Sequence, residues 1–171
     1  GGHLDDPTVK TGGNAGYHGG LRFSPLRVPQ NAVVRTAWLA VTATDDAGMD
    51  TQLRIYAHAA DHSPSFSTQG IVQNRPRTEH YATWDLRERP WQSKGIYRSP
   101  ELREVVQEVV SRPGWRNGNA LSLLLIAQPA TIGSPRSIYS YEGDADKRAE
   151  LHVYYTKLED VPTPTPTVTT T

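Results

Sequence analysis

The residues of this chain best suited to contact a ligand are aromatic rings that carry a polar group. The sequence contains four Trp and eight Tyr but only two Phe. Indole and phenol rings combine a broad apolar face with a hydrogen-bonding edge, so they suit stacking against pyranose sugars. Several of these rings lie around a predicted helix or on a late predicted strand. These are the candidate carbohydrate-binding residues: Trp84, Trp91, Tyr97, Trp115, Tyr139 and Tyr141.

The same rings have a second interpretation, because β-sandwich proteins also bury Trp and Tyr as core or corner residues. Each ring could therefore belong to the core instead of a ligand platform. Trp38 lies in the middle of a predicted strand and is expected to be structural. The two interpretations differ in the exposure that they predict for the rings.

Acidic residues gather at several predicted turns and supply the oxygen atoms that a calcium ion requires. None of these clusters has the spacing of a helix-loop-helix calcium loop, and Asp is also an ordinary turn former. The sequence implies no required cofactor, and a structural calcium ion is a candidate. Its candidate ligands are Asp45, Asp46, Asp61, Glu142 and Asp144.

Catalytic signatures are missing from the sequence, which has no Cys and no motif for a nucleophile elbow, phosphate loop, zinc protease or dinucleotide site. His58 and His62, with Asp61 between them, could bind a transition metal, although solvated loop residues are the alternative. Glu79 and Asp85 could form a carboxylate pair for glycoside hydrolysis, but no feature of the sequence supports this. The chain is therefore predicted not to be an enzyme.

Composition favours one turn-rich β domain, with 14 Gly and 13 Pro among 171 residues. The 18 basic and 18 acidic residues give a formal net charge of zero. This balance argues against nucleic acid as the main partner. No apolar run approaches the roughly 18 residues that a membrane helix needs, so no membrane insertion is expected.

The spacing of apolar side chains predicts the elements that must position these residues. Alternation with a period of two predicts β-strands over 21–23, 33–44, 53–57, 81–84, 120–128, 137–141 and 150–156. In the last of these strands, the core is expected to contain Leu151, Val153 and Tyr155. His152 and Tyr154 are expected to face solvent.

One segment has helical spacing instead, with an apolar face formed by Leu102, Val105, Val106, Val109 and Val110. Ser99 as N-cap, Pro100 at the first helical position and Pro113 after the end predict a helix over about 99–112. The expected fold is all-β. It is a two-sheet antiparallel β-sandwich with this one inserted amphipathic helix.

The last residues, 161–171, read VPTPTPTVTTT and differ in composition from the rest of the chain. Alternating Pro and Thr favours an extended segment that adds little to a core. The expected organisation is a sandwich module over 1–160 and a Pro/Thr-rich linker over 161–171. Such a linker is typical of exported multi-domain proteins. It predicts an extracellular, secreted or cell-surface location with other domains of the same chain as partners, and a frayed tail is the alternative.

Five strings in order along the chain carry a resemblance to a known family: GLRFSPLRVPQNAVVRTAWLAVTATDD, LRIYAHAADHSPSFS, TWDLRERPWQ, SPELREVVQEVVSRPGWRNGNALSLLLIA and IYSYEGDADKRAELHVYY. Their order resembles bacterial extracellular β-sandwich modules found in large secreted multi-domain proteins. It is more distantly similar to DNRLRE-type carbohydrate-binding modules. The resemblance implies a jelly-roll-like sandwich with a non-catalytic role and, in some members, a structural calcium. Glu142 departs from the family's usual turn but could still supply an oxygen ligand.

These observations predict a non-catalytic extracellular carbohydrate-binding accessory module of a larger secreted or cell-surface protein, with a polysaccharide or glycan as its partner. The alternative is a structural or adhesive spacer domain that binds no small ligand and buries its aromatic rings. A glycan-active enzyme is the third hypothesis. It would require a cleft that holds two carboxylates about 5–10 Å apart.

Overall fold

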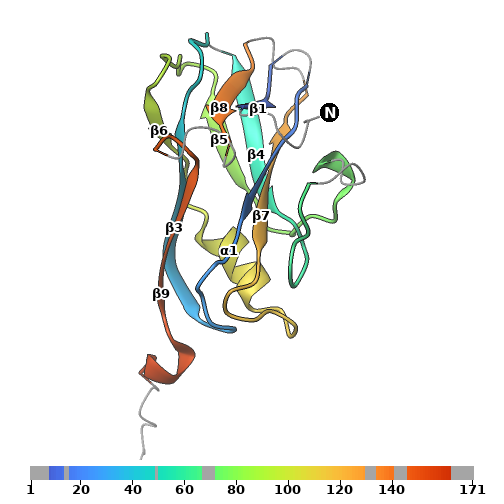
Figure 1. The fold of residues 1–171 in the computed structure, drawn as a ribbon, viewed down its shortest axis with the longest axis vertical. Coiled ribbons are helices and arrows are strands. Elements are labelled where there is room, and N and C mark those ends of the chain that lie inside the picture. Colours follow the sequence, from blue (N-terminus) through green and yellow to red (C-terminus); the bar gives the residue numbers. More distant parts are fainter. Residues whose placement is uncertain are drawn as a thin grey trace, which may run out of the picture.

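The computed structural model describes residues 8–13, 16–48, 50–66, 72–129, 134–140 and 146–162. These residues form three antiparallel sheets and one α-helix (Figure 1). The sequence-based expectation of an all-β sandwich with a single helix is confirmed. The predicted linker is described only as far as Pro162, and 163–171 lie outside the described residues.

Seven of the nine described strands agree with the predicted ranges to within two residues at each end, whereas β1 and β6 lie outside those ranges. Their bounds are β1 Thr8–Thr11, β2 Gly19–Phe23, β3 Val33–Thr42, β4 Thr51–Ala57, β5 Ala82–Leu86, β6 Ile96–Arg98, β7 Leu121–Ala127, β8 Arg136–Tyr139 and β9 Glu150–Thr156. The helix α1 spans Arg103–Val110, and short 3₁₀ turns occupy Val72–Asn74 and Leu158–Asp160.

The two larger sheets form the layers of the sandwich, with strand orders β2-β7-β4-β5 and β6-β3-β9. A third, two-stranded sheet pairs β1 with β8. An isolated bridge between Ala43 and Ile138 connects this small sheet to the residue that follows β3. Neighbouring strands of the sandwich are therefore often distant in the sequence, as β3 and β9 are.

Strand β7 is buried along its whole length, as its run of apolar residues predicts. Leu123 and Leu125 belong to the central core cluster. The loop between β4 and β5 covers the opposite side of this region, where Phe66 and Val72 pack against the backbone of Gly20 on β2. A side chain at Gly20 would overlap the Phe66 ring, so the close approach of the loop requires glycine there.

Strand β3 contains a β-bulge between Val34 and Thr36. The bulge shifts the alternation, so Val34 is buried whereas Val33 is only half-buried. Beyond it the predicted alternation holds, with Ala37 and Leu39 fully buried. The intervening residue, Trp38, therefore lies on the outer face of the β6-β3-β9 sheet.

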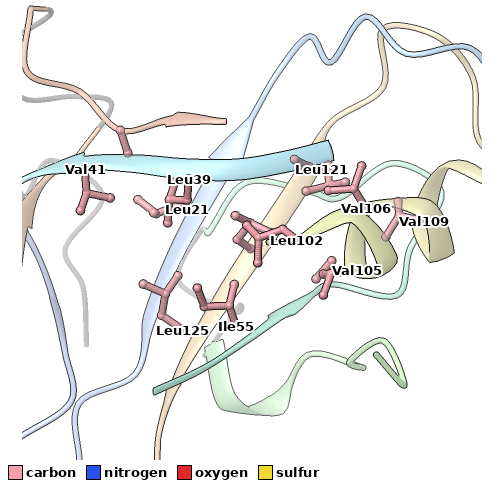
Figure 2. Packing of buried hydrophobic residues seen from close by; sticks show 14 of the residues in the cluster. Leu21, Leu39, Val41, Ile55, Leu102, Val105, Val106, Val109, Leu121 and Leu125 are labelled. Carbon is pink, nitrogen blue, oxygen red and sulfur yellow. The ribbon is translucent and has the colours of Figure 1, made fainter. Parts of the chain in front are cut away.

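Helix α1 closes one end of the space between the two sheets (Figure 1). Its four valines are buried, and Figure 2 shows Leu102, Val105 and Val106 packed near Ile55 and Leu121 from the strands. The apolar spacing of the helix thus predicts its buried face correctly.

The helix is shorter than the predicted 99–112 because the preceding residues pair with β3. The backbone N–H groups of Ser99 and Leu102 donate to the carbonyls of Leu39 and Ala37, both at 2.8 Å. The Ser99 hydroxyl accepts from Leu39 N–H instead of capping the helix. Leu102 is the N-cap residue, without a side-chain hydrogen bond. Pairing with the strand takes the place of the predicted first helical turn.

Candidate ligand-binding surface

Three of the predicted sugar-binding rings belong to the core. The exposed fractions of Trp84, Trp91 and Trp115 are 6%, 3% and 1%. A ring enclosed on both faces has no surface on which a sugar can stack, so the prediction of a platform at these tryptophans is corrected. Trp115 also donates its indole N–H to the Val28 carbonyl at 2.8 Å. The spacer interpretation predicted that these three rings would be buried, as they are.

The predicted tyrosines are partly enclosed. Tyr97 stacks on Trp91 with ring centroids 4.5 Å apart and an interplanar angle of 4°. Its hydroxyl accepts the backbone N–H of Gln92 at 2.7 Å. Tyr139 is half-buried, with the ammonium group of Lys147 5.4 Å from its ring centroid. Tyr141 lies outside the described residues. A ligand role for Tyr97 and Tyr139 stays a prediction.

The structure does not bring the described calcium candidates together. Asp45 and Asp46 precede β4, whereas Asp61 follows that strand. Asp45 accepts a hydrogen bond from the hydroxyl of Thr44, and Asp46 accepts one from the N–H of Ser93. Within the described ranges, no three His, Asp or Glu side chains are grouped closely enough to hold a metal ion.

The third calcium candidate, Asp61, forms an ion pair with Arg112 at 2.7 Å. This contact connects the loop after β4 to the end of the helical segment. The remaining candidates, Glu142 and Asp144, lie outside the described residues. Calcium binding at 142–144 therefore stays a prediction.

A Ser–His contact lies in the interior beneath the β4–β5 loop. Nδ1 of His58 is 2.8 Å from Oγ of Ser63, which also donates to Ser122 and accepts from Arg75. The pKa of His58 is lowered by burial and then by the charges of Arg75 and Arg112. Ser63 is fully buried, so no substrate reaches its hydroxyl in this structure. The contact therefore fixes the loop instead of forming a nucleophile site.

The other residues considered for chemistry also have structural partners. His62 accepts the N–H of Ala120. Asp85 forms a two-point contact with Arg87, at 2.9 and 2.7 Å, and this contact lowers the pKa of Asp85. A catalytic acid for glycoside hydrolysis needs a raised pKa, so Asp85 does not suit that role.

An exposed group of stacked rings lies on the outer face of the β6-β3-β9 sheet. Trp38 of β3 stacks on His152 and Tyr154 of β9, with centroid separations of 4.9 and 5.5 Å. We call these three rings the ring platform. From the other neighbouring strand, β6, the guanidinium carbon of Arg98 lies 3.9 Å from the centroid of Trp38. The register of the sheet produces this group, because Trp38 is directly opposite His152.

The rings of the ring platform are stacked with nearly parallel planes near the sheet edge. The rings of His152 and Tyr154 lie within 8° and 17° of the indole plane of Trp38. Both come from the same side of Trp38, and in the described sheet β9 is an edge strand. The ring faces turned away from Trp38 are therefore directed off that edge. Tyr154 is 58% exposed, the highest value of any Tyr, Trp or Phe in the described ranges.

Polar groups surround the ring platform. Glu150 lies 3.1 Å from the His152 ring nitrogen, and Arg35 donates to the hydroxyl of Thr156 at 3.1 Å. Flat rings with hydrogen-bonding groups at their edges suit a sugar, which has apolar C–H faces and equatorial hydroxyl groups. Sequence reasoning placed His152 and Tyr154 correctly on the solvent side, but Tyr155, which it expected in the core, is 36% exposed. It did not identify the platform, because the pairing of β3 with β9 is a tertiary feature.

A separate surface cavity of about 280 Å³ lies beside α1. His80 and Glu108 line it and form an ion pair, with Nδ1 of His80 2.7 Å from the carboxylate. The carboxylate also accepts the backbone N–H groups of Glu79 and His80. The pair thus attaches the segment before β5 to the helix.

We expect His80 to titrate above its ordinary pKa of about 6.5. Hydrogen bonding to Glu108 raises the pKa of His80. Burial raises the pKa of Glu108. Hydrogen bonds from the backbone and ring of His80 and from the backbone of Glu79 outweigh this effect, so the pKa of Glu108 is lowered overall. The stabilisation from His80 is therefore complete below about pH 6.5 and is lost as the pH rises through its raised pKa. That from Glu108 is lost as the pH falls through its lowered pKa.

Proton NMR of the imidazole resonances between pH 4 and 9 measures this shift. The E108Q variant should return His80 towards its ordinary pKa. His58 serves as the internal control, because burial lowers its pKa and the substitution does not touch it. A wild-type pKa of His80 at or below the ordinary value would contradict the prediction.

No protein-family model matches this chain, and no curated protein matches it with significant similarity. In the described part of the chain, no helix is both long and apolar enough to cross a membrane.

Proposed function

We propose that the chain is a non-catalytic carbohydrate-binding module that holds a polysaccharide against the ring platform of Trp38, His152 and Tyr154. The observation that carries the proposal is the nearly parallel stacking of His152 and Tyr154 on Trp38. The proposal keeps the ligand class expected from the sequence but assigns it to a different set of rings.

Stacking on the platform would bury the apolar face of a sugar ring against Tyr154 and His152. Trp38 supports both rings from behind, and Arg98 packs on the opposite side of Trp38. Because the rings are fixed by stacking, little side-chain freedom is lost when the ligand binds. The hydroxyl of Tyr154 would provide a hydrogen-bonding group at the edge of the sugar.

The wider setting is part of the same proposal. The Pro/Thr-rich residues 161–171 support an extracellular protein in which this module is connected to other domains. A single open platform gives modest affinity, and several linked modules on one polymer would increase it by avidity.

A structural or adhesive spacer domain is the second candidate function. The burial of Trp84, Trp91 and Trp115 favours it, because three of the rings first considered for ligand binding are used for the core. This candidate predicts that the protein binds no polysaccharide and that Tyr154 can be replaced without a functional effect.

Retention on a panel of insoluble and immobilised neutral polysaccharides, with calcium and with chelator, separates the two candidates. We expect retention on one class of glycan and about a fivefold loss of affinity in Tyr154→Ala, because an aromatic contact contributes about 1 kcal/mol. The double variant with His152→Ala should lose roughly 25-fold if the two rings contribute independently.

Tyr155→Ala is the matched control. Tyr155 is the next residue of β9 and is 36% exposed, but its position in the strand alternation directs it to the opposite face of the sheet. Far-ultraviolet circular dichroism of each variant tests that the fold is intact. Equal losses of affinity in Tyr155→Ala and Tyr154→Ala would favour the spacer. The absence of any retention of the wild-type protein would also favour it.

A further inference from the structure

A second group of surface side chains, half-buried on β4 and exposed beyond it, lies on the outer face of the other sheet, at β4 and the start of β5. Tyr56 and Tyr81 are in contact, with ring centroids 5.2 Å apart. The guanidinium carbon of Arg54 lies 4.4 Å from the Tyr81 centroid, and that of Arg77 lies 5.2 Å from the Tyr56 centroid. We call these four residues the Arg/Tyr cluster.

The topology explains how the Arg/Tyr cluster forms. Arg54 and Tyr56 alternate with the buried Leu53, Ile55 and Ala57 on β4, so both face outwards. Tyr81 immediately precedes β5, which pairs with β4. Arg77 is positioned by a backbone bridge with His58, just beyond the end of β4.

The charges of Arg54 and Arg77 have no acidic partner in the described part of the chain. Arg77 makes one long hydrogen bond, 3.5 Å, to the carbonyl of Gln73. The closest acid on β5, Asp85, is occupied by Arg87 at 2.7 Å. Glu79 lies two residues from Arg77 but forms no ion pair with it, so both arginines are cations without an ion-paired acid in the described part of the chain.

The charge of Arg77 also affects His18. Burial and then the charge of Arg77 lower the pKa of His18. Nδ1 of His18 accepts the backbone N–H of Ala127 at 3.1 Å, which the neutral ring with its proton on Nε2 can do. The neutral form of His18 is therefore favoured first by burial and then by the charge of Arg77.

We propose that the Arg/Tyr cluster binds the carboxylate groups of an acidic polysaccharide. A guanidinium group matches a carboxylate with two parallel hydrogen bonds, and stacking on a tyrosine ring holds its plane in place. The two tyrosines between the arginines provide ring faces for sugar units and hydroxyl groups for hydrogen bonds. Two separated cations suit a polymer with repeated acidic groups better than a single small anion.

The Arg/Tyr cluster and the ring platform are on different sheets, so neither proposal depends on the other. The cluster can bind a uronate polymer even if the platform binds no neutral glycan.

Affinity electrophoresis in gels that contain polygalacturonate tests the proposal. We expect the wild-type protein to be retarded at low salt, with less retardation as salt increases. The substitutions R54Q and R77Q should each weaken binding about fivefold, the size expected for one exposed charge contact. The double variant should weaken it by roughly 25-fold.

One charge-matched control, a double variant, removes two arginines from elsewhere on the surface. Arg27 and Arg116 are both exposed, and the double variant R27Q/R116Q changes the net charge by the same amount as R54Q/R77Q. Retardation by polygalacturonate that survives in R27Q/R116Q but not in R54Q/R77Q would support the proposal. Equal losses in both double variants would overturn it, because net charge alone would then explain binding.

Further arms distinguish the chemical class of the ligand. Gels with neutral dextran, with dextran sulfate and with duplex DNA, and sedimentation with phosphatidylserine vesicles, are run in parallel at the same ionic strength. Tighter Arg54- and Arg77-dependent binding to any of these probes than to polygalacturonate would overturn the carboxylate assignment. The absence of binding to polygalacturonate would overturn it as well.

Discussion

Replacing Trp115 with Ala is expected to lower the free energy of unfolding by about 4–5 kcal/mol, the upper part of the range for truncation of a large buried side chain. Trp115 is 1% exposed and packs in the core cluster with the helix valines. Its removal leaves a large cavity, because the surrounding strands and helix are fixed by their own pairing and cannot collapse fully. The Val28 carbonyl also loses its indole donor.

Urea denaturation followed by circular dichroism at 25 °C measures this loss. Trp115→Phe separates the two contributions, because it retains most of the apolar volume and removes only the hydrogen bond and part of the ring. It should cost about 2 kcal/mol. A loss below about 1 kcal/mol in Trp115→Ala would contradict the burial of this ring.

This outcome also bears on function. If Trp115 contacted a ligand, as its sequence position suggested, its replacement would weaken binding by the folded protein. With the ring in the core, we expect the folded fraction of Trp115→Phe to bind a polysaccharide as the wild-type does. The stability of this variant would change and its affinity would not.

The fold was accessible from the sequence because local patterns determine most of it. Alternation identified β4 and β9, and the helical spacing of Val105, Val106, Val109 and Val110 identified the buried face of α1. The predicted start of α1 was wrong, because the backbone N–H groups of Ser99 and Leu102 pair with β3. That competition depends on a strand about sixty residues earlier in the sequence and leaves no local signal.

The candidate site was less accessible for a related reason. Residue type alone made Trp84 a candidate, yet its alternation with the neighbouring Leu86 on β5 placed both residues in the core. Trp38 was expected to be structural because it lies in mid-strand, and on the outer face of its sheet it packs against His152 and Tyr154. The stacking of Trp38 with His152 required knowledge of which strands are neighbours.

Arg136 is the second position at which a large effect on stability is expected. It is fully buried, and its guanidinium group donates to the carbonyls of Ser134 at 3.0 Å, Leu86 at 3.1 Å and Arg89 at 2.9 Å. The guanidinium carbon also lies 5.5 Å from the centroid of Trp91. The side chain thus connects the start of β8 to the turn after β5.

The cation itself is costly at this position. In the described part of the chain Arg136 has no ion pair with a carboxylate, and burial lowers the pKa of Arg136. Its Nε and the indole nitrogen of Trp91 are buried donors with no hydrogen-bond partner among the described residues. The three carbonyl contacts must therefore offset the desolvation of a charged group.

This balance predicts different results for two substitutions. Arg136→Ala removes the carbonyl contacts and leaves a cavity, so it should lower the free energy of unfolding by about 3–5 kcal/mol. Arg136→Met retains much of the volume and removes the buried charge, so it should cost roughly half as much. Arg116→Ala, at an exposed position, is the control and should change stability by no more than about 0.5 kcal/mol.

Urea denaturation of the three variants decides between packing and hydrogen bonding as the main role of Arg136. If Arg136→Met and Arg136→Ala are equally destabilising, the hydrogen bonds to the carbonyls are the main contribution of Arg136 to stability, because the volume that Met retains does not stabilise the fold. If Met is as stable as the wild-type protein, the hydrogen bonds only compensate for burying the charge. A loss in Arg136→Ala as small as that in Arg116→Ala would mean that Arg136 does not hold β8 against the turn after β5.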